Sequence, residues 1–301
     1  QSYLPGDDSA LIWQENLSFS QMPQVANPDS GFVFSANQTP FNVTAAAENP
    51  KESALAPEHG FQQDMSNRAH RGLELFAALG PMISKEEFSA IKHDKFYSRS
   101  TFYVAYLDTI AVQSFTDPSL QRAQQVLAQW DLGTDVDNTG AALGTCVFLA
   151  AERADDRETH DAQAVADLLG GCVETLLAST GRLDPPWGEV NRHVRGDVNV
   201  PVGGGPDILR AIYGRDLNDD GFLTNVAGDG LYYLVAWDAQ GQLSVEGVHQ
   251  FGSATLDDAS PHYSDQVLDY ANELLHAPLF DEDALQANLL RAYRPGGELV
   301  R

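Results

Sequence analysis

Apolar side chains recur every three or four residues in two parts of the chain, which is the spacing of an amphipathic helix. One part is the segment 64–79, where arginines and large apolar residues fall on separate faces. The other is the segment 102–180, which we predict to be a helical insertion with its last helix at about 161–179. We expect this insertion to pack against a sheet and to carry no chemistry. Its periodic apolar positions are Leu120, Ala123, Val126, Leu127, Trp130, Ala142, Leu143, Val147, Phe148 and Leu149.

Short runs rich in β-branched and aromatic residues predict strands on both sides of this insertion. The run Gly31–Ala36, with Pro28 before it and Pro40 after it, predicts a short strand. Residues 231–237 and 243–248 flank the turn sequence Asp-Ala-Gln-Gly, which predicts a β-hairpin.

Further helices are indicated by their start signals and spacing. Ser84 and Glu87 have the spacing of a capping box, which predicts that a helix opens there. Residues 264–274 and 281–291 have the pattern of closing helices, whereas prolines and glycine in residues 43–63 predict a loop.

The net charge of the chain excludes some classes of binding partner but says little about the fold. The 301 residues are 43% hydrophobic and 20% charged, as in an ordinary globular protein, and the formal net charge is −25. Such a charge argues against binding to nucleic acid or anionic membranes, because phosphates are repelled. No apolar run reaches the roughly 18 residues of a membrane span, and residues 1–12 lack the features of a signal peptide. The chain opens on Gln1, as a processed or trimmed product does.

Two cysteines, Cys146 and Cys172, lie in the helical insertion. They lack the spacing of metal ligands, so they are either two buried thiols or one disulfide.

Residues 216–221 copy the first half of a calcium-binding EF-hand loop, with Asp216, Asn218 and Asp220 at the ligand positions. The twelfth position of that loop is Ala227, where a bidentate Glu is expected. The pattern leaves two interpretations, a bound calcium ion or an Asx-rich turn, and it favours the turn.

Two other motifs fail as catalytic sequences. The glycines at 203–205 are not followed by the Lys-Ser/Thr of a phosphate-binding loop, so we interpret them as a turn. Ser260, His262 and Asp265 suggest a hydrolase triad, but no nucleophile elbow surrounds the serine.

Charged clusters have plain structural interpretations as well. Lys92, His93 and Lys95 suggest a charged ligand, but their position favours a solvated helix end. Asp131, Asp135 and Asp137 lack a fixed ligand spacing, which favours a loop.

Two amides, Asn37 and Gln38, stand at the end of the predicted strand 31–36. A side-chain amide held there can direct an N–H at a fixed point, as the stabilisation of an oxyanion requires. The alternative is that Asn37 closes a turn, which is common for Asn before Pro40.

Blocks of sequence in a fixed order resemble the penicillin acylase (penicillin amidase) family, in particular its acyl-homoserine lactone acylase branch. The blocks begin with the Pro-Asp-Ser-Gly-Phe segment that ends in Asn37 and cover nearly the whole chain. The later ones are Trp187–Arg192, Val202–Asp207, Gly228–Gly230, Gln250–Ser253, Ser260–Gln266 and Tyr293–Gly296.

This resemblance implies an α+β fold, part of the four-layer αββα sandwich of N-terminal nucleophile hydrolases with mainly antiparallel sheets. Within it, residues 1–101 carry the oxyanion strand and pocket helices, 102–180 the helical insertion, and 181–301 strands and C-terminal helices. Asn37 matches the family's oxyanion-hole amide, and Arg68 matches an arginine that supports the site. The alternative for Arg68 is a solvated arginine on the surface of its helix.

The family's nucleophile is an N-terminal Ser whose free α-amine is the base, and Gln1 cannot replace it. The resemblance therefore identifies the chain as the C-terminal part of the large subunit, with the Ser in a companion segment, and the chain alone as inactive. It implies hydrolysis of linear amides, such as acyl-homoserine lactone or penicillin-type amides, in the periplasm or outside the cell, without a cofactor. The alternative is a non-catalytic, acylase-like binding or scaffolding module.

Overall fold

The structure is a computed structural model, and it describes residues 5–12, 15–54, 60–80, 82–154, 161–215, 222–294, 296 and 299–300. The chain divides into two units. The first unit comprises Gln1–Ser84 and Ser98–Thr101, and the second comprises Lys85–Tyr97 and Phe102–Arg301.

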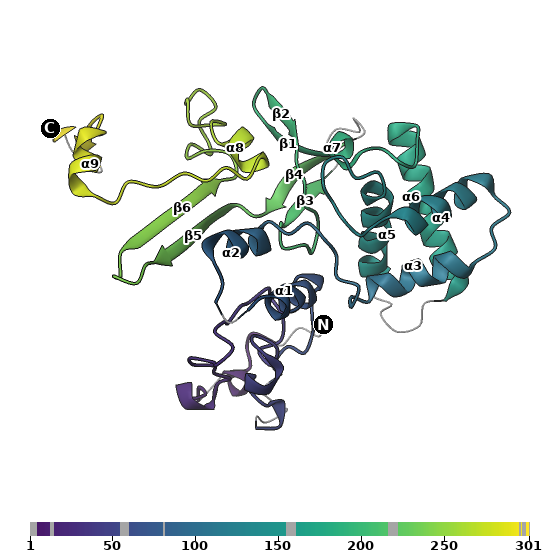
Figure 1. Cartoon of the computed structure of the whole chain (residues 1–301), viewed down its shortest axis with the longest axis horizontal. Coiled ribbons are helices and arrows are strands. Elements are labelled where there is room, and N and C mark those ends of the chain that lie inside the picture. Colours follow the sequence, from purple (N-terminus) through teal and green to yellow (C-terminus); the bar gives the residue numbers. More distant parts are fainter. Residues whose placement is uncertain are drawn as a thin grey trace. The chain divides into compact units, whose positions relative to one another are not determined.

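The first unit is built around helix α1 (Asn67–Ala78), which confirms the helix predicted at 64–79 (Figure 1). Ser66 is its N-cap, so the helix begins later than the apolar spacing alone predicts. Asn67 is buried and accepts the backbone N–H of Ser98 at 2.8 Å, which joins residues 98–101 to this unit. Short 3₁₀ turns lie at Ser9–Leu11, Phe19–Gln21, Ala46–Glu48 and Glu52–Ala54.

The second unit contains the helical insertion, and its helices confirm the prediction for 102–180 (Figure 1). Helix α2 (Lys85–Lys92) precedes it and starts directly after Ser84, the first residue of the predicted capping box. The insertion consists of α3 (Tyr103–Val112), α4 (Pro118–Gln129), α5 (Ala141–Ala154) and α6 (Ala162–Thr180).

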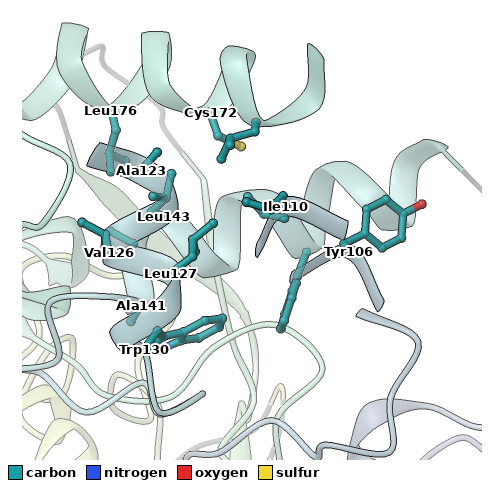
Figure 2. Close-up of a cluster of buried hydrophobic side chains, with 14 of the residues drawn as sticks. Tyr106, Ile110, Ala123, Val126, Leu127, Trp130, Ala141, Leu143, Cys172 and Leu176 are labelled. Atoms are coloured by element: carbon teal, nitrogen blue, oxygen red, sulfur yellow. The ribbon is translucent and has the colours of Figure 1, made fainter. Parts of the chain in front are cut away.

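The apolar faces of these helices form one core. Figure 2 shows part of it, with Leu176 and Cys172 projecting from α6 and Trp130 at the end of α4. Trp130 donates its indole N–H to the Gly133 carbonyl at 2.8 Å, so this large ring is buried with its polar group satisfied. Leu223 of the following sheet packs against the same core.

Cys146 of α5 and Cys172 of α6 form a disulfide, which settles the choice that the sequence leaves open. The bond closes a loop with a sequence separation of 26 residues. Closing such a loop stabilises the fold mainly by restricting the unfolded chain.

A four-stranded sheet of order β2-β1-β4-β3 follows the helices. Its strands are β1 (Asn191–Arg195), β2 (Val198–Pro201), β3 (Ile212–Arg215) and β4 (Leu223–Gly228), and the short helix α7 (Trp187–Val190) leads into β1. The pairs β1–β2 and β3–β4 are antiparallel, whereas β1 and β4 are parallel.

Strands β5 (Leu231–Trp237) and β6 (Leu243–His249) form the predicted hairpin (Figure 1). Leu231, Tyr233, Val235 and Trp237 are exposed, whereas Leu234 between them is buried. This alternation is that of a sheet with one face on a core.

The closing helices are shorter than predicted: α8 spans Val267–Ala271 and α9 spans Glu282–Ala287. Glu273 has a φ of 60°, a left-handed conformation that cannot continue the helix. The last described strands are β7 (Ala292–Tyr293) and β8 (Leu299–Val300). Within the described residues, no helix is both long and apolar enough to cross a bilayer.

Candidate functional site

Residues 31–35 do not form a strand, so the prediction of a strand at 31–36 is wrong. Phe34 donates its N–H to the Val43 carbonyl at 2.9 Å, as in a sheet. The neighbouring backbone groups are taken by side chains instead: Thr44 donates to the Phe32 carbonyl at 2.7 Å, and Asn49 accepts the Val43 N–H at 2.8 Å. Side-chain bonds of this kind compete with the ladder of a sheet.

The segment is nevertheless held in one place by α1. The rings of Phe32 and Phe76 are stacked with centroids 4.4 Å apart, and Phe34 lies 5.7 Å from Phe76. Gly72 makes room for this packing, because a Cβ there would lie 2.9 Å from the Phe34 ring. Apolar packing therefore fixes the segment that leads to Asn37.

Ser66 ties the end of this segment to the start of α1. Its hydroxyl donates to the Ala36 carbonyl at 3.1 Å and accepts the Ala69 N–H at 3.1 Å. The N-cap of the helix is thus bonded to the residue before Asn37. Sequence reasoning missed this role of Ser66, although a Ser directly before the helical spacing is a usual N-cap signal.

Asn37 and Arg68, both singled out from the sequence, are brought into contact by this arrangement. Arg68 Nη2 donates to Asn37 Oδ1 at 3.1 Å. An arginine side chain has donors only, so the amide must turn its oxygen toward Arg68 and its NH₂ group away from it. Within the described residues, no acceptor is bonded to that NH₂ group, and Asn37 is exposed.

The backbone of Asn37 is left-handed, with a φ of 63°. Asn tolerates this conformation better than most residues, so the turn-forming property that its sequence context predicts is also present. Its carbonyl accepts a hydrogen bond from the Gln62 amide at 3.2 Å. Asn37 therefore has a conformation that suits a turn and an amide whose orientation is set by Arg68.

Gln38, the other amide at this position, is turned inward and is 8% exposed. Its Oε1 accepts the Ala36 N–H at 2.5 Å, and its Nε2 donates to the Asn42 carbonyl at 3.0 Å. Gln38 holds the local backbone, and Asn37 is the amide that can meet a ligand.

The charged residues at the end of α2 are not a solvated helix end, so that interpretation is wrong. Lys92 Nζ lies 2.6 Å from Asp229 Oδ2, and Lys95 Nζ lies 3.0 Å from Glu273 Oε1. His93 Nε2 is 2.8 Å from the Tyr232 hydroxyl. Burial lowers the pKa of Lys92, although the charge of Asp229 opposes that shift.

These contacts surround Arg210, whose side chain is fully buried. Its Nη1 lies 3.2 Å from Asp229 Oδ2, and its Nη2 donates to the Tyr270 carbonyl at 2.6 Å. The guanidinium also lies over the Tyr270 ring, 4.2 Å from its centroid. Both Nη atoms of this buried charge are paired, whereas its Nε has no hydrogen-bond partner among the described residues and lies 3.6 Å from Glu273 Oε1. The Asp229 contact ties the Gly228–Gly230 block to this buried charge, so we interpret that block as structural.

Ser260, His262 and Asp265 do not form a triad. His262 Nδ1 lies 2.8 Å from Asp265 Oδ2, as in a hydrolase, but Ser260 Oγ accepts the backbone N–H of His262 at 3.1 Å. A catalytic serine must instead face the second ring nitrogen of its histidine.

The calcium candidates Asp216, Asn218 and Asp220 lie outside the described residues. Among the residues that the structure does describe, no group of three or more His, Cys, Asp or Glu side chains could hold a metal ion. Asp131, of the predicted acidic loop, accepts hydrogen bonds from the Gly133 N–H and the Asn138 amide, both at 2.8 Å.

Comparison with known proteins places the chain in a family. A sequence model of the penicillin amidase family matches residues 1–287, and the chain therefore belongs to that family. Its fold is similar to that of a thermostable penicillin G acylase from Alcaligenes faecalis, with a TM-score of 0.51 and 14% sequence identity. The match covers 96% of this chain and 60% of that structure's chain, so this chain spans little more than half of its relative's length.

Together, family and structure support a mixed α+β fold of the penicillin acylase type. The four-layer sandwich and the three-part division at residues 101 and 180 stay predictions.

Proposed function

We propose that this chain is part of an acylase that hydrolyses linear amides, and that Asn37 donates a hydrogen bond to the oxyanion of the tetrahedral intermediate. The observation that carries the proposal is the 3.1 Å contact between Arg68 Nη2 and Asn37 Oδ1. It turns the amide NH₂ group outward, which is the orientation that an oxyanion donor needs.

In the proposed reaction, a serine hydroxyl attacks the amide carbonyl carbon, and the carbonyl oxygen becomes negatively charged. Collapse of this intermediate breaks the C–N bond, releases the amine and leaves an acyl-enzyme that water hydrolyses to a carboxylic acid. The serine and its α-amine belong, in this proposal, to a companion segment of the same precursor. The share of the Alcaligenes faecalis chain that the match leaves uncovered supports such a segment.

Asn37 and Arg68 have different roles in this proposal. Asn37 contacts the reacting atoms, and Arg68 positions the amide of Asn37. The arrangement requires no redox or organic cofactor, because the nucleophile and its base are one residue. We place the substrates among acyl-homoserine lactones and penicillin-type amides, and the enzyme in the periplasm or outside the cell, on the basis of the resemblance.

The test is a comparison of three variants of the complete enzyme, in which the residues of this chain are joined by the rest of the precursor. Asn37→Ala should lower kcat by about 10²–10³-fold, the usual loss for one oxyanion-hole donor, with little change in KM. Asn37→Gly and Asn37→Asp keep the tolerance for a left-handed backbone but remove the N–H donor.

If the proposal holds, Gly and Asp variants lose activity to a similar extent as the Ala variant. If Asn37 only forms a turn, Gly and Asp variants keep nearly full activity while the Ala variant loses stability. Near-normal turnover by Asn37→Gly would therefore exclude the oxyanion role and leave turn formation as the better interpretation of Asn37.

A further inference from the structure

A cavity of about 200 Å³ lies within the second unit, among α5, α6, α7 and the start of β4. Its large apolar walls are Leu149, Leu176, Trp187, Val190, Phe222 and Leu223. Leu149 and Leu176 come from the helical insertion, which the sequence analysis expects to carry no chemistry.

The polar groups of helix α6 that line the cavity are bonded within the protein. Thr175 Oγ1 donates to the Gly171 carbonyl at 2.8 Å, and Ser179 Oγ donates to the Thr175 carbonyl at 2.8 Å. The indole N–H of Trp187 donates to the Gly204 carbonyl at 2.8 Å. These three groups therefore do not require a polar ligand, and the large apolar walls favour carbon atoms. Thr145 Oγ1, on α5, is the exception in the lining, because it is buried without a hydrogen-bond partner in the part of the chain that the structure describes.

Arg153 alone carries a charge among the described residues that line the cavity. It lies in the last turn of α5 and is exposed, so its guanidinium can meet both the cavity and solvent. A guanidinium binds a carboxylate with two parallel hydrogen bonds. The net charge of −25 repels anions at long range, but physiological salt screens that repulsion beyond about 8 Å.

The volume limits the ligand to a small molecule. An apolar cavity of about 150 Å³ is known to hold one benzene molecule. A cavity of about 200 Å³ thus fits a single aromatic ring or an alkyl chain of similar volume, with a short polar group at its mouth.

We propose that this cavity binds a small aryl or alkyl carboxylate, with its carbon body against Leu149, Leu176 and Leu223 and its carboxylate at Arg153. The helical insertion then contains a ligand site, in contrast to the expectation that it carries no chemistry. The proposal does not depend on Asn37 or on amide hydrolysis, since every residue in it belongs to the second unit.

The experiment is a titration of the 301-residue chain with benzoate and with its neutral counterpart benzyl alcohol, followed by methyl NMR shifts. We expect benzoate to shift the methyl signals of Leu149, Leu176 and Leu223 with a dissociation constant of about 1 mM or lower, as is reasonable for so small a ligand. Arg153→Gln should weaken benzoate binding roughly three- to fivefold, in line with a partly exposed ion pair. The same variant should leave the binding of benzyl alcohol unchanged.

Filling the cavity gives a second, independent test. Ala150, a partly buried lining residue on α5, can be replaced by Phe, and Ala150→Phe should weaken benzoate binding more than tenfold. Ala178→Phe is the matched control, because Ala178 is exposed on α6 and does not line the cavity. Thermal melting checks that both variants fold. If Ala150→Phe does not fold, Arg153→Gln still tests the proposal, because its position is exposed.

Three results would overturn the proposal. The first is the absence of any benzoate-dependent shift at the cavity methyls up to the solubility limit. The second is unchanged binding by a folded Ala150→Phe variant. The third is equal binding of benzoate by the wild type and Arg153→Gln, which would contradict the assignment of a carboxylate.

Discussion

Arg68 Nη2 lies 3.1 Å from Asn37 Oδ1, so the first turn of α1 is bonded to the residue that follows the Phe32–Phe34 segment. The two residues are separated by 31 positions in the sequence. Their contact depends on the stacking of Phe32 on Phe76 and on the Ser66 hydroxyl, which together hold the segment against the helix.

This contact predicts that Arg68 and Asn37 act as one unit in catalysis. In the complete enzyme, Arg68→Met should lower kcat by about tenfold, the approximate worth of one hydrogen bond to a charged group. Because Arg68 acts through Asn37, the double variant Arg68→Met, Asn37→Ala should be little worse than Asn37→Ala. Steady-state kinetics of the four proteins measure this coupling, and fully additive losses would show that the two residues act independently.

Removing one partner of a buried ion pair in the second unit should reduce the free energy of unfolding more than removing one partner of an exposed pair. Asp229→Ala leaves the fully buried Arg210 without its partner at 3.2 Å, and we expect a loss of about 3–5 kcal/mol in the free energy of unfolding. Asp184→Ala is the matched control, since Asp184 and Arg122 are 39% and 49% exposed and lie 2.7 Å apart. The free energy of unfolding of Asp184→Ala should fall by at most about 1 kcal/mol.

Urea denaturation at neutral pH measures both variants. A loss below about 1 kcal/mol for Asp229→Ala would mean that Glu273, whose Oε1 lies 3.6 Å from Arg210 Nε, takes over the role of Asp229. It would contradict our interpretation of Asp229 as the main partner.

The helices of the insertion could be predicted because each carries its own signal. Their apolar residues recur at helical spacing, and local residues such as Asp117 before Pro118 mark where α4 begins. The β5–β6 hairpin could be predicted for the same reason, since its turn lies between two apolar runs.

The errors arose where contacts outside a segment's own pattern decide its structure. Lys92 has the pattern of a solvated helix end, but its partner Asp229 is 137 residues away. Residues 31–35 have the composition of a strand, but Thr44 and Asn49 take the backbone groups that a ladder needs. The contact between Asn37 and Arg68 could be anticipated only through family resemblance, because no local pattern links the two residues.

Two glycines in the insertion predict opposite effects of the same substitution. A Cβ on Gly144 of α5 would lie 2.1 Å from the Trp130 ring, whereas a Cβ on Gly171 of α6 meets nothing within 4 Å. Gly144→Ala should therefore destabilise the protein by about 1–3 kcal/mol through overpacking. Gly171→Ala should stabilise it by about 0.5–1 kcal/mol, because Ala is the better helix former. Thermal or urea unfolding measures both, and a destabilising Gly171→Ala would contradict the open environment of that position.

The last prediction concerns His193, a fully buried residue of β1. Its Nε2 lies 2.6 Å from the Gln250 carbonyl and must carry the proton, so Nδ1 accepts from the Asn225 amide at 3.1 Å. Burial lowers the pKa of His193 from 6.5 to about 4, against the opposing effect of its bond to Gln250.

The consequence is a loss of stability in mild acid. Between pH 6.5 and about 4, the unfolded histidine binds a proton that the folded one excludes, so the free energy of unfolding falls as the pH falls through this window. Above pH 6.5 the contribution of His193 is constant. Each pH unit is worth about 1.4 kcal/mol, so His193 should account for about 2 kcal/mol of the stability lost between pH 7 and pH 5.

His193→Gln should remove that part of the loss, whereas His262→Gln, at a residue whose side chain is 63% exposed, should not. Urea denaturation of the three proteins at pH 7 and pH 5 gives the loss of unfolding free energy for each. The titration of the many carboxylates is common to all three, so it cancels when the variants are compared with the wild type. Equal pH dependence in the wild type and His193→Gln would show that the buried imidazole does not exclude its proton in the folded protein.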